Sequence, residues 1–231
     1  MVHFVTFGSK QIRFHLSLSN RKSLGITVTP ELDVLVIAPI NSPIEKIKEK
    51  ILKKAAWIIK QQSFFLSFEP KTSLRKYVSG ETHLYLGRQY RLKVIVAKKN
   101  FVHFNGRIIE IYVKPKSKAK DVLGHWYKQK AKEKFAEIAE PLILKFKKYK
   151  VEPESLNIQS MPTRWGSCTP KGKIILNPEL IKAPKPCIEY VIAHELCHLI
   201  HHDHTKKFMD LQTKEMSDWE KWKSKLEMIL A

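Results

Sequence analysis

The most constraining feature of this chain is a cluster of histidines between residues 194 and 204. Five of the ten histidines of the 231-residue chain lie in this stretch, which contains the pattern H-E-x-x-H from His194 to His198. A helix advances about 1.5 Å and turns about 100° per residue, so residues four apart share one face, about 6 Å apart along the axis. We therefore expect a helix here with both imidazoles on one face.

Two imidazoles in this arrangement can bind one metal ion, and H-E-x-x-H on a helix is typical of zinc hydrolase sites. Glu195 lies beside the two histidines, where its carboxylate can accept a proton from a water whose pKa a metal ion has lowered. We interpret His194 and His198 as zinc ligands and Glu195 as a general base. One Zn²⁺ ion is the expected cofactor, and imidazole also binds other first-row metals.

A catalytic zinc site needs a third protein ligand and an open position, and three more histidines follow the pattern. His201 shares the helical face but lies about 10 Å further along the axis than His194, too far to share one ion on a straight helix. His204 is the better candidate if the helix ends near residues 201 and 202 and the chain folds back. A fourth ligand from His201, His202 or Asp203 would instead indicate a closed, structural site.

Two further features support a site here rather than a chance pattern on a surface helix. A strongly apolar segment, residues 188–193, precedes the histidines, so we expect a buried helix to carry them. Upstream lies the motif R-W-G-S-C at Arg164–Cys168, followed by Leu176-Asn177. Together with Y-V-x-x-H-E-L-x-H at Tyr190–His198 and D-H, a basic pair and Phe at Asp203–Phe208, these motifs resemble the YgjP-like metallopeptidase family, relatives of the SprT-like and WLM metalloproteases.

The resemblance covers nearly the whole chain, more weakly in its N-terminal half, and implies specific roles. It implies zinc on His194, His198 and His204, with Glu195 as the base. It also implies that the strand Arg164–Cys168 borders the cleft, where an extended polypeptide substrate would lie along it. The candidate substrate-binding residues are Arg164, Trp165, Gly166 and Ser167. Taken singly, Arg164 could also form a structural ion pair, and Trp165 could belong to the core.

The composition predicts the cellular compartment of the protein. No apolar run approaches the roughly 20 residues that span a bilayer, and the first residues lack the basic and apolar regions of a secretion signal. Three cysteines, Cys168, Cys187 and Cys197, leave one unpaired in any case and suit a reducing compartment. We expect a cytoplasmic protein with no membrane segment, and we interpret Cys168 and Cys197 as small buried packing residues.

The net charge of +20, from 42 basic and 22 acidic residues, is the second informative feature. Such a field attracts polyanions, so non-specific nucleic-acid association is an alternative partner prediction. Lysine outnumbers arginine and no base-reading motif is present, which argues against specific DNA recognition. Lysine-rich faces are also commonly just solvated.

Three functional classes therefore compete. The first is a zinc metallopeptidase that hydrolyses peptide bonds. The second is a basic, nucleic-acid-associated protein with a structural zinc site, or a protease that acts on DNA-bound proteins. The third is a non-peptide hydrolase that uses the same water chemistry. We favour the metallopeptidase, and the sequence leaves its oligomeric state and physiological substrate open.

The first part of the chain alternates apolar and polar residues in short runs, which is typical of strands in an antiparallel sheet. We expect strands at residues 12–18, 25–29, 34–38, 83–86, 90–96, 101–104 and 108–113. Asn105-Gly106, between the last two, is a strong hairpin signal. One long helix should interrupt the strands, with Ser42 as N-cap, Pro43 at its first position and Glu45 closing a capping box.

The second part is expected to be mainly helical. A helix should run from about Ala119 to Tyr149, and Pro141 should kink or break it. A short β-hairpin at Arg164 and the histidine-bearing helix follow. The predicted fold class is α+β, with a β-rich N-terminal region that includes one long helix, residues 1–116, and a mainly helical, zincin-like metallopeptidase domain, residues 117–231.

Overall fold

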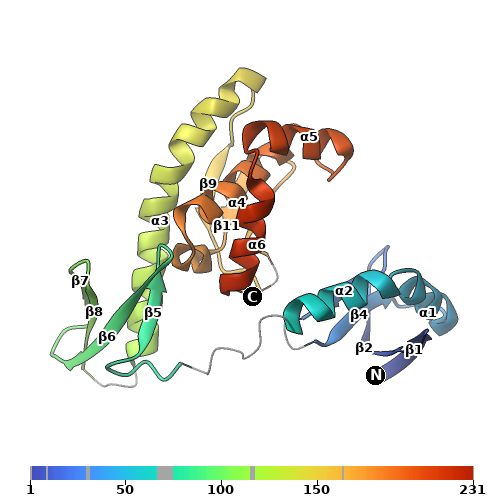
Figure 1. The fold of residues 1–231 in the computed structure, drawn as a ribbon, viewed down its shortest axis with the longest axis horizontal. Coiled ribbons are helices and arrows are strands. Elements are labelled where there is room, and N and C mark those ends of the chain that lie inside the picture. The colour runs from blue at the N-terminus through green and yellow to red at the C-terminus, as the bar shows by residue number, and fades with distance from the viewer. Residues whose placement is uncertain are drawn as a thin grey trace. The chain divides into compact units, whose positions relative to one another are not determined.

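The structure is a computed structural model that describes residues 2–8, 10–29, 32–66, 75–114, 118–162 and 164–230. The described residues form six α-helices and three small sheets, a mixed fold that is β-rich in its N-terminal part and helical in its C-terminal part. The chain divides into two compact units, Met1–Ser73 and Leu74–Leu230 (Figure 1). The division between these units lies at Ser73–Leu74, before the predicted domain boundary between residues 116 and 117. The separate domains 1–116 and 117–231 remain a prediction.

The first unit is a sheet packed against two helices. Its strands are β1 (Val2–Phe7), β2 (Lys10–Ser19), β3 (Gly25–Val28) and β4 (Val34–Pro39), in the order β1-β2-β4-β3. The helices α1 (Ile44–Lys53) and α2 (Ala55–Leu66) contribute Ile47, Ile51 and Ile58 to a core that also contains Phe14 and Val36. Alternation along β4, where Val34, Val36 and Ala38 are buried, produces the apolar face that these helices cover.

The single long helix predicted from residue 42 is wrong in two respects. Ser42 lies in the turn after β4, where its N–H donates to the Pro39 carbonyl, and Pro43 caps α1 without a side-chain hydrogen bond. The capping box is therefore not formed. The helix also ends at Lys53, because the N–H of the next residue, Lys54, bonds to the Ile51 carbonyl three residues back, and α2 begins at Ala55.

The second unit begins with a four-stranded sheet that packs on a long helix. The strands are β5 (Thr82–Tyr85), β6 (Arg88–Val96), β7 (Phe101–Phe104) and β8 (Ile108–Val113), in the order β5-β6-β8-β7. The helix α3 (Ala119–Phe146) places Trp126 against Tyr85, with ring centroids 5.1 Å apart, and against Phe104, at 6.0 Å. These contacts put the sheet and α3 in one core, which is why the compact unit includes both.

Pro141 does not break α3, contrary to one expectation from the sequence. The helix continues to Phe146 and is followed by the 3-10 helix η2 (Lys147–Tyr149). Pro141 itself is exposed, whereas Phe135, Ile138, Ala139 and Phe146 on either side of it are buried. Packing on both sides of the proline holds the two segments in one helix, so the lost backbone hydrogen bond is tolerated.

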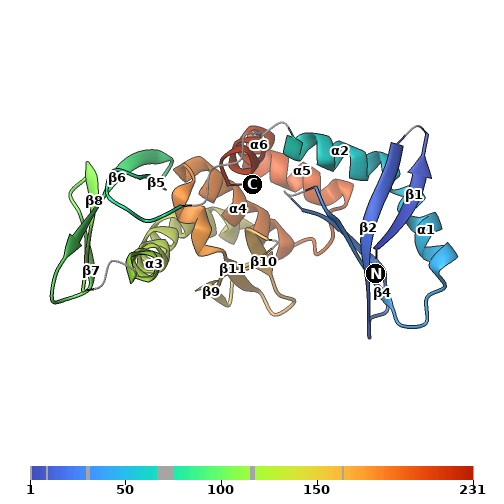
Figure 2. The ribbon, with the colours of Figure 1, turned by 90° about the horizontal axis from the view of Figure 1, so that it is seen from below.

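The rest of the unit is built around helix α4 (Lys185–His198). A three-stranded sheet, β10-β11-β9, is formed by β9 (Ser155–Ile158), β10 (Gly166–Cys168) and β11 (Lys173–Leu176), so β10 lies at its edge. The 3-10 helix η3 (Pro178–Lys182) precedes α4, and helices α5 (Lys206–Glu215) and α6 (Trp219–Leu230) follow it. Helix α4 lies between α3 and the C-terminal helices (Figure 2).

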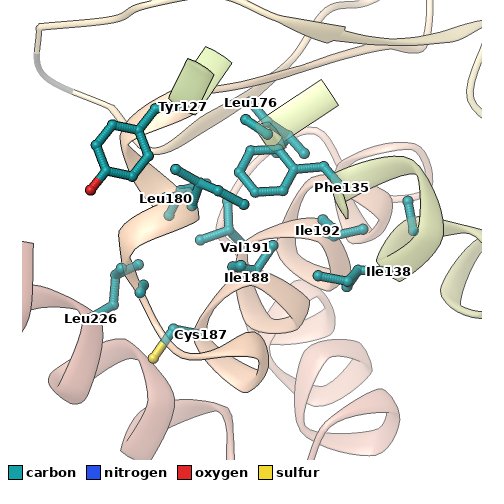
Figure 3. Close-up of a cluster of buried hydrophobic side chains, with 14 of the residues drawn as sticks. Tyr127, Phe135, Ile138, Leu176, Leu180, Cys187, Ile188, Val191, Ile192 and Leu226 are labelled. Atoms are coloured by element: carbon teal, nitrogen blue, oxygen red, sulfur yellow. The ribbon is translucent and has the colours of Figure 1, made fainter. Parts of the chain in front are cut away.

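The core around α4 explains why this helix is rigidly held. Ile188, Val191 and Ile192 of α4 pack with Phe135 and Ile138 of α3, and Leu226 of α6 closes the cluster (Figure 3). Most faces of α4 are therefore buried, as the apolar segment predicts, and the remaining face carries the histidines. None of the helices in the described part of the chain combines the length and apolar character that a bilayer crossing needs.

Candidate metal centre and its cleft

Helix α4 ends at His198, earlier than the end near residues 201 and 202 that the sequence suggested. The N–H groups of Leu199 and Ile200 bond three residues back, to Leu196 and Cys197, so the last turn tightens and the helix stops. The chain then folds back, and His204 lies just before α5. This return brings His204 to the same face of α4 as His194 and His198.

The three imidazoles converge on one point. Ring nitrogens of His194, His198 and His204 lie within 4.8 Å of one another, and the Nε2 atoms of His194 and His204 are 3.0 Å apart. Such a set of three nitrogen donors fits a first-row transition metal and leaves room for a further ligand. The described part of the chain contains no other cluster of three or more potential metal ligands.

Hydrogen bonds at the outer nitrogens fix two of these rings. His194 Nδ1 donates to Gln212 Oε1 of α5 at 2.9 Å, and His198 Nδ1 donates to the His201 carbonyl at 3.2 Å. A neutral imidazole that donates through Nδ1 has an unprotonated Nε2. Both rings are thus held in the tautomer whose free lone pair faces the cluster, as is usual for metal-binding histidines.

Burial keeps these imidazoles neutral. It lowers the pKa of His194 to about 4, although the Gln212 hydrogen bond acts in the opposite direction. Burial also lowers the pKa of His198, against the effect of its bond to the His201 carbonyl. Near pH 7 both side chains are therefore uncharged bases, which is the state that binds a metal ion.

Glu195 points into the same site and is almost completely buried, with 5 % of its surface exposed. Burial raises the pKa of its carboxyl to about 8, while the charge of Arg164 and a hydrogen bond from the Cys168 N–H lower it. A divalent cation beside it would also favour the ionised form. The carboxyl group is thus close to the balance between its two protonation states, as proton-transfer groups often are.

Gly166 allows β10 to approach this carboxylate closely. A Cβ atom on Gly166 would lie 2.6 Å from Glu195 Oε1 and 2.9 Å from Val191 Cγ1. Both distances are shorter than van der Waals contact. Position 166 must therefore remain glycine for β10 and α4 to lie at this separation.

A cleft of about 720 Å³ runs between β10 and α4. The predicted site residues all line it: Arg164, Trp165, Gly166, Ser167, His194, Glu195, His198 and His204. The strand is shorter than the expected Arg164–Cys168, because Arg164 and Trp165 precede β10. Since β10 is an edge strand, the backbone groups on its free side are available to an extended ligand, except for the Cys168 N–H, which bonds to Glu195.

Three residues of the site were missed or misread in the sequence. Tyr190 lines the cleft one helical turn before His194, a position that the i, i+4 spacing could have revealed. No sequence pattern identified Gln212 as a site residue, because it contacts His194 from a different helix. Cys168 was expected to be a buried packing residue, yet it is only partly buried and lines the cleft, whereas Cys187 and Cys197 are buried.

Comparison with known proteins agrees with this geometry. The family model described as the YgjP-like metallopeptidase domain matches residues 22–228. No curated protein matches the chain significantly. The matched region contains both motifs and the cleft between them, and it covers nearly the whole sequence. The chain therefore belongs to the YgjP-like metallopeptidase family.

Proposed function

We propose that this protein is a zinc-dependent metallopeptidase that hydrolyses peptide bonds in polypeptide substrates. Its ligands for one Zn²⁺ ion would be His194, His198 and His204, with Glu195 as general base. The observation that carries this proposal is the convergence of three imidazoles beside a buried carboxylate, within one cleft. When bound, zinc supplies a Lewis acid that polarises the scissile carbonyl and lowers the pKa of water.

Glu195 then performs the proton transfers. Its carboxylate accepts a proton from the attacking water and afterwards delivers it to the leaving amine. The Cys168 N–H and Arg164 favour the ionised carboxylate at the start, and burial favours its protonated form once the proton has been accepted. The surroundings of Glu195 therefore stabilise both the ionised and the protonated carboxyl group, and the reaction requires both.

The cleft suggests how the substrate is held. An extended peptide can add to the free edge of β10 through backbone hydrogen bonds, which makes recognition independent of most side chains. Ser167, whose backbone is paired with Ile175, would line the cleft, and Gly166 would provide backbone groups at this edge. Arg164 and Trp165 lie at its start, where they would contact the substrate. This arrangement favours unfolded or extended segments as substrates.

The test is cleavage of an unfolded polypeptide by zinc-loaded protein. Glu195→Gln should retain zinc and lose activity, because the amide cannot accept the proton. Glu189→Gln is the matched control, since Glu189 lies on the same helix, pairs with Lys185 and is outside the cleft. Chelation should abolish cleavage and added zinc should restore it.

Two results would overturn the proposal. One is equal activity of wild type and Glu195→Gln, which would exclude the proposed base. The other is inactivity of the wild type together with four protein ligands on zinc, measured by X-ray absorption. That result would indicate the closed structural site instead.

A further inference from the structure

The cleft does not end at the histidines. A second hollow of about 310 Å³ adjoins it at the C-terminal end of α4, and the two share Pro170, His198 and His202 in their linings. The far side of this hollow is formed by the segment after η2, with Lys150, and by the turn between β10 and β11, with Lys171. A ligand lying over His198 can therefore extend into it.

Close contacts fix where this hollow lies relative to β10. Gly166, at the start of the strand, lies against Glu195 and Val191, whereas Gly172, at the end of the following turn, lies against Leu199. A Cβ atom on Gly172 would be 3.5 Å from Leu199 Cδ2. The strand therefore runs alongside α4 in the same direction as the helix. A peptide on its free edge that passes the histidines reaches the turn that carries Lys171.

Lys150 has an unusual backbone conformation. Its φ and ψ are 59° and 32°, in the left-handed region, where glycine or asparagine normally occurs at the end of a helix. A lysine is therefore held in a conformation that its Cβ atom disfavours. Strained positions of this kind cluster at functional sites, and this one lies on the rim of the second hollow.

The charges in this hollow are unbalanced. Lys150 and Lys171 are exposed, and neither forms an ion pair with any residue of the described chain. The single acidic residue of the lining, Glu152, pairs with Lys147, with 3.5 Å between Nζ and Oε1. The hollow therefore presents two cations whose charge is free to attract a ligand.

We propose that Lys150 and Lys171 form a cationic subsite that binds an acidic side chain of the substrate, on one side of the scissile bond. This inference rests on the proposed peptidase function. The subsite lies at one end of the cleft, so an aspartate or glutamate is favoured on one flank of the cleaved bond and not on the other. An exposed ion pair changes an equilibrium by about 1.4- to fivefold, so the two lysines together should raise kcat/KM for acidic peptides about 2- to 25-fold.

The test uses a series of peptides that differ at one position, with Glu, Gln or Lys scanned along both flanks of the cleaved bond. Glu should raise kcat/KM on one flank only, and 0.5 M NaCl should remove most of the effect by screening exposed charges. The double variant Lys150→Glu, Lys171→Glu should reverse the order of the Glu and Lys peptides. Lys173→Glu is the matched control, because this exposed lysine lies two residues beyond Lys171 and outside both hollows.

Lys150→Gly gives an independent variant in which folding is not at risk. Glycine relieves the left-handed conformation, so thermal stability should stay the same or rise while the preference for Glu peptides falls. A general effect of the basic surface would instead appear equally in Lys173→Glu. Equal kcat/KM for the Glu, Gln and Lys peptides would overturn the subsite and leave the peptidase function intact.

If the wild type cleaves none of the peptides and its zinc has four protein ligands, the peptidase proposal fails, and binding of the same peptides still decides the subsite. Fluorescence polarisation would then be measured for wild type, the double variant and Lys173→Glu. Tighter binding of the Glu peptide that only the double variant loses would support the subsite. Equal binding by all three proteins would overturn it.

Discussion

The Gly166→Ala variant should show how strongly activity depends on the position of the Glu195 carboxylate, because it displaces this group without changing its chemical nature. The new methyl group would lie 2.6 Å from Glu195 Oε1, 2.9 Å from Glu195 Cγ and 2.9 Å from Val191 Cγ1. Normal contacts are about 3.5 Å, so strand and helix must separate by several tenths of an ångström up to about 1 Å. Rotating the Glu195 carboxylate relieves only the first contact, because Cγ and Val191 are also too close.

Displacements of this size are costly in catalysis. A misplacement of about 1 Å can reduce rate about 100-fold, so we expect kcat to fall about 10- to 100-fold. Zinc content should remain unchanged, because none of the three histidines is touched. Overpacking should also lower stability by about 1–3 kcal/mol. Steady-state kinetics, metal analysis and urea unfolding measure these three effects.

Gly124→Ala is the matched control for this substitution. A Cβ atom on Gly124, within α3, would have no heavy atom within 4 Å. Activity should be unchanged, and stability should rise by about 0.5–1 kcal/mol because alanine is the better helix former. Wild-type kcat in Gly166→Ala would refute the reasoning, since it would mean that β10 and α4 can separate without consequence for Glu195.

The remaining predictions concern the surroundings of the site. Gln212→Leu should weaken zinc binding about 10- to 100-fold, because it removes the acceptor for His194, and Gln212→Glu should restore much of the affinity. In the metal-free protein two effects of Gln212→Leu oppose each other, because it removes Gln212 Nε2, which is buried without a partner within the described chain, but leaves His194 Nδ1 without its acceptor. The free energy of unfolding should therefore change by no more than about 1 kcal/mol. Unchanged zinc affinity in calorimetric titration, or a larger loss of stability in urea unfolding, would contradict this prediction. Burial tends to raise the pKa of Glu215, but hydrogen bonds from Tyr149 and Lys148 outweigh it and hold the pKa below its usual range. Glu215→Gln should therefore cost roughly 2 kcal/mol at pH 7. This difference should begin to shrink as pH falls through about 4.3, the ordinary pKa of a glutamate, and should vanish once pH is below the lowered pKa of Glu215 in the folded protein; a difference independent of pH in urea titrations would exclude an ionic contribution.

The local pattern of apolar, polar and turn-forming residues was sufficient to predict much of the fold. The strands 101–104 and 108–113 are found as predicted, because alternation and an Asn-Gly turn specify a hairpin without reference to the rest of the chain. The helix carrying H-E-x-x-H is likewise confirmed, since its apolar segment requires a buried helix. The predicted break at Pro141 is not found, because packing on both sides of the proline, which the local pattern does not contain, keeps the two segments within one helix.

The candidate site shows the same division between local and distant information. The spacing of His194 and His198 is local, and so both could be identified from the sequence. The return of His204 depends on where α4 stops, and the contact between Gly166 and Glu195 depends on how closely a strand approaches a helix. Neither the end of α4 nor the distance between β10 and α4 is determined by the sequence of one segment alone. Gln212 lies 18 residues from His194 and belongs to another helix, so no periodicity connects them.

The position of α5 has a consequence for metal exchange. This helix follows His204 directly, and it bonds to His194 through Gln212 and to α3 through Glu215. A bound ion would therefore join α4 to the segment just before α5, and local opening of α5 would free that segment to release the ion. We expect the rate of zinc transfer to a strong chelator to follow the hydrogen-exchange opening of residues 206–215, and Glu215→Gln to accelerate both. Metal retention would then be governed by the local unfolding of a helix that supplies none of the three ligands.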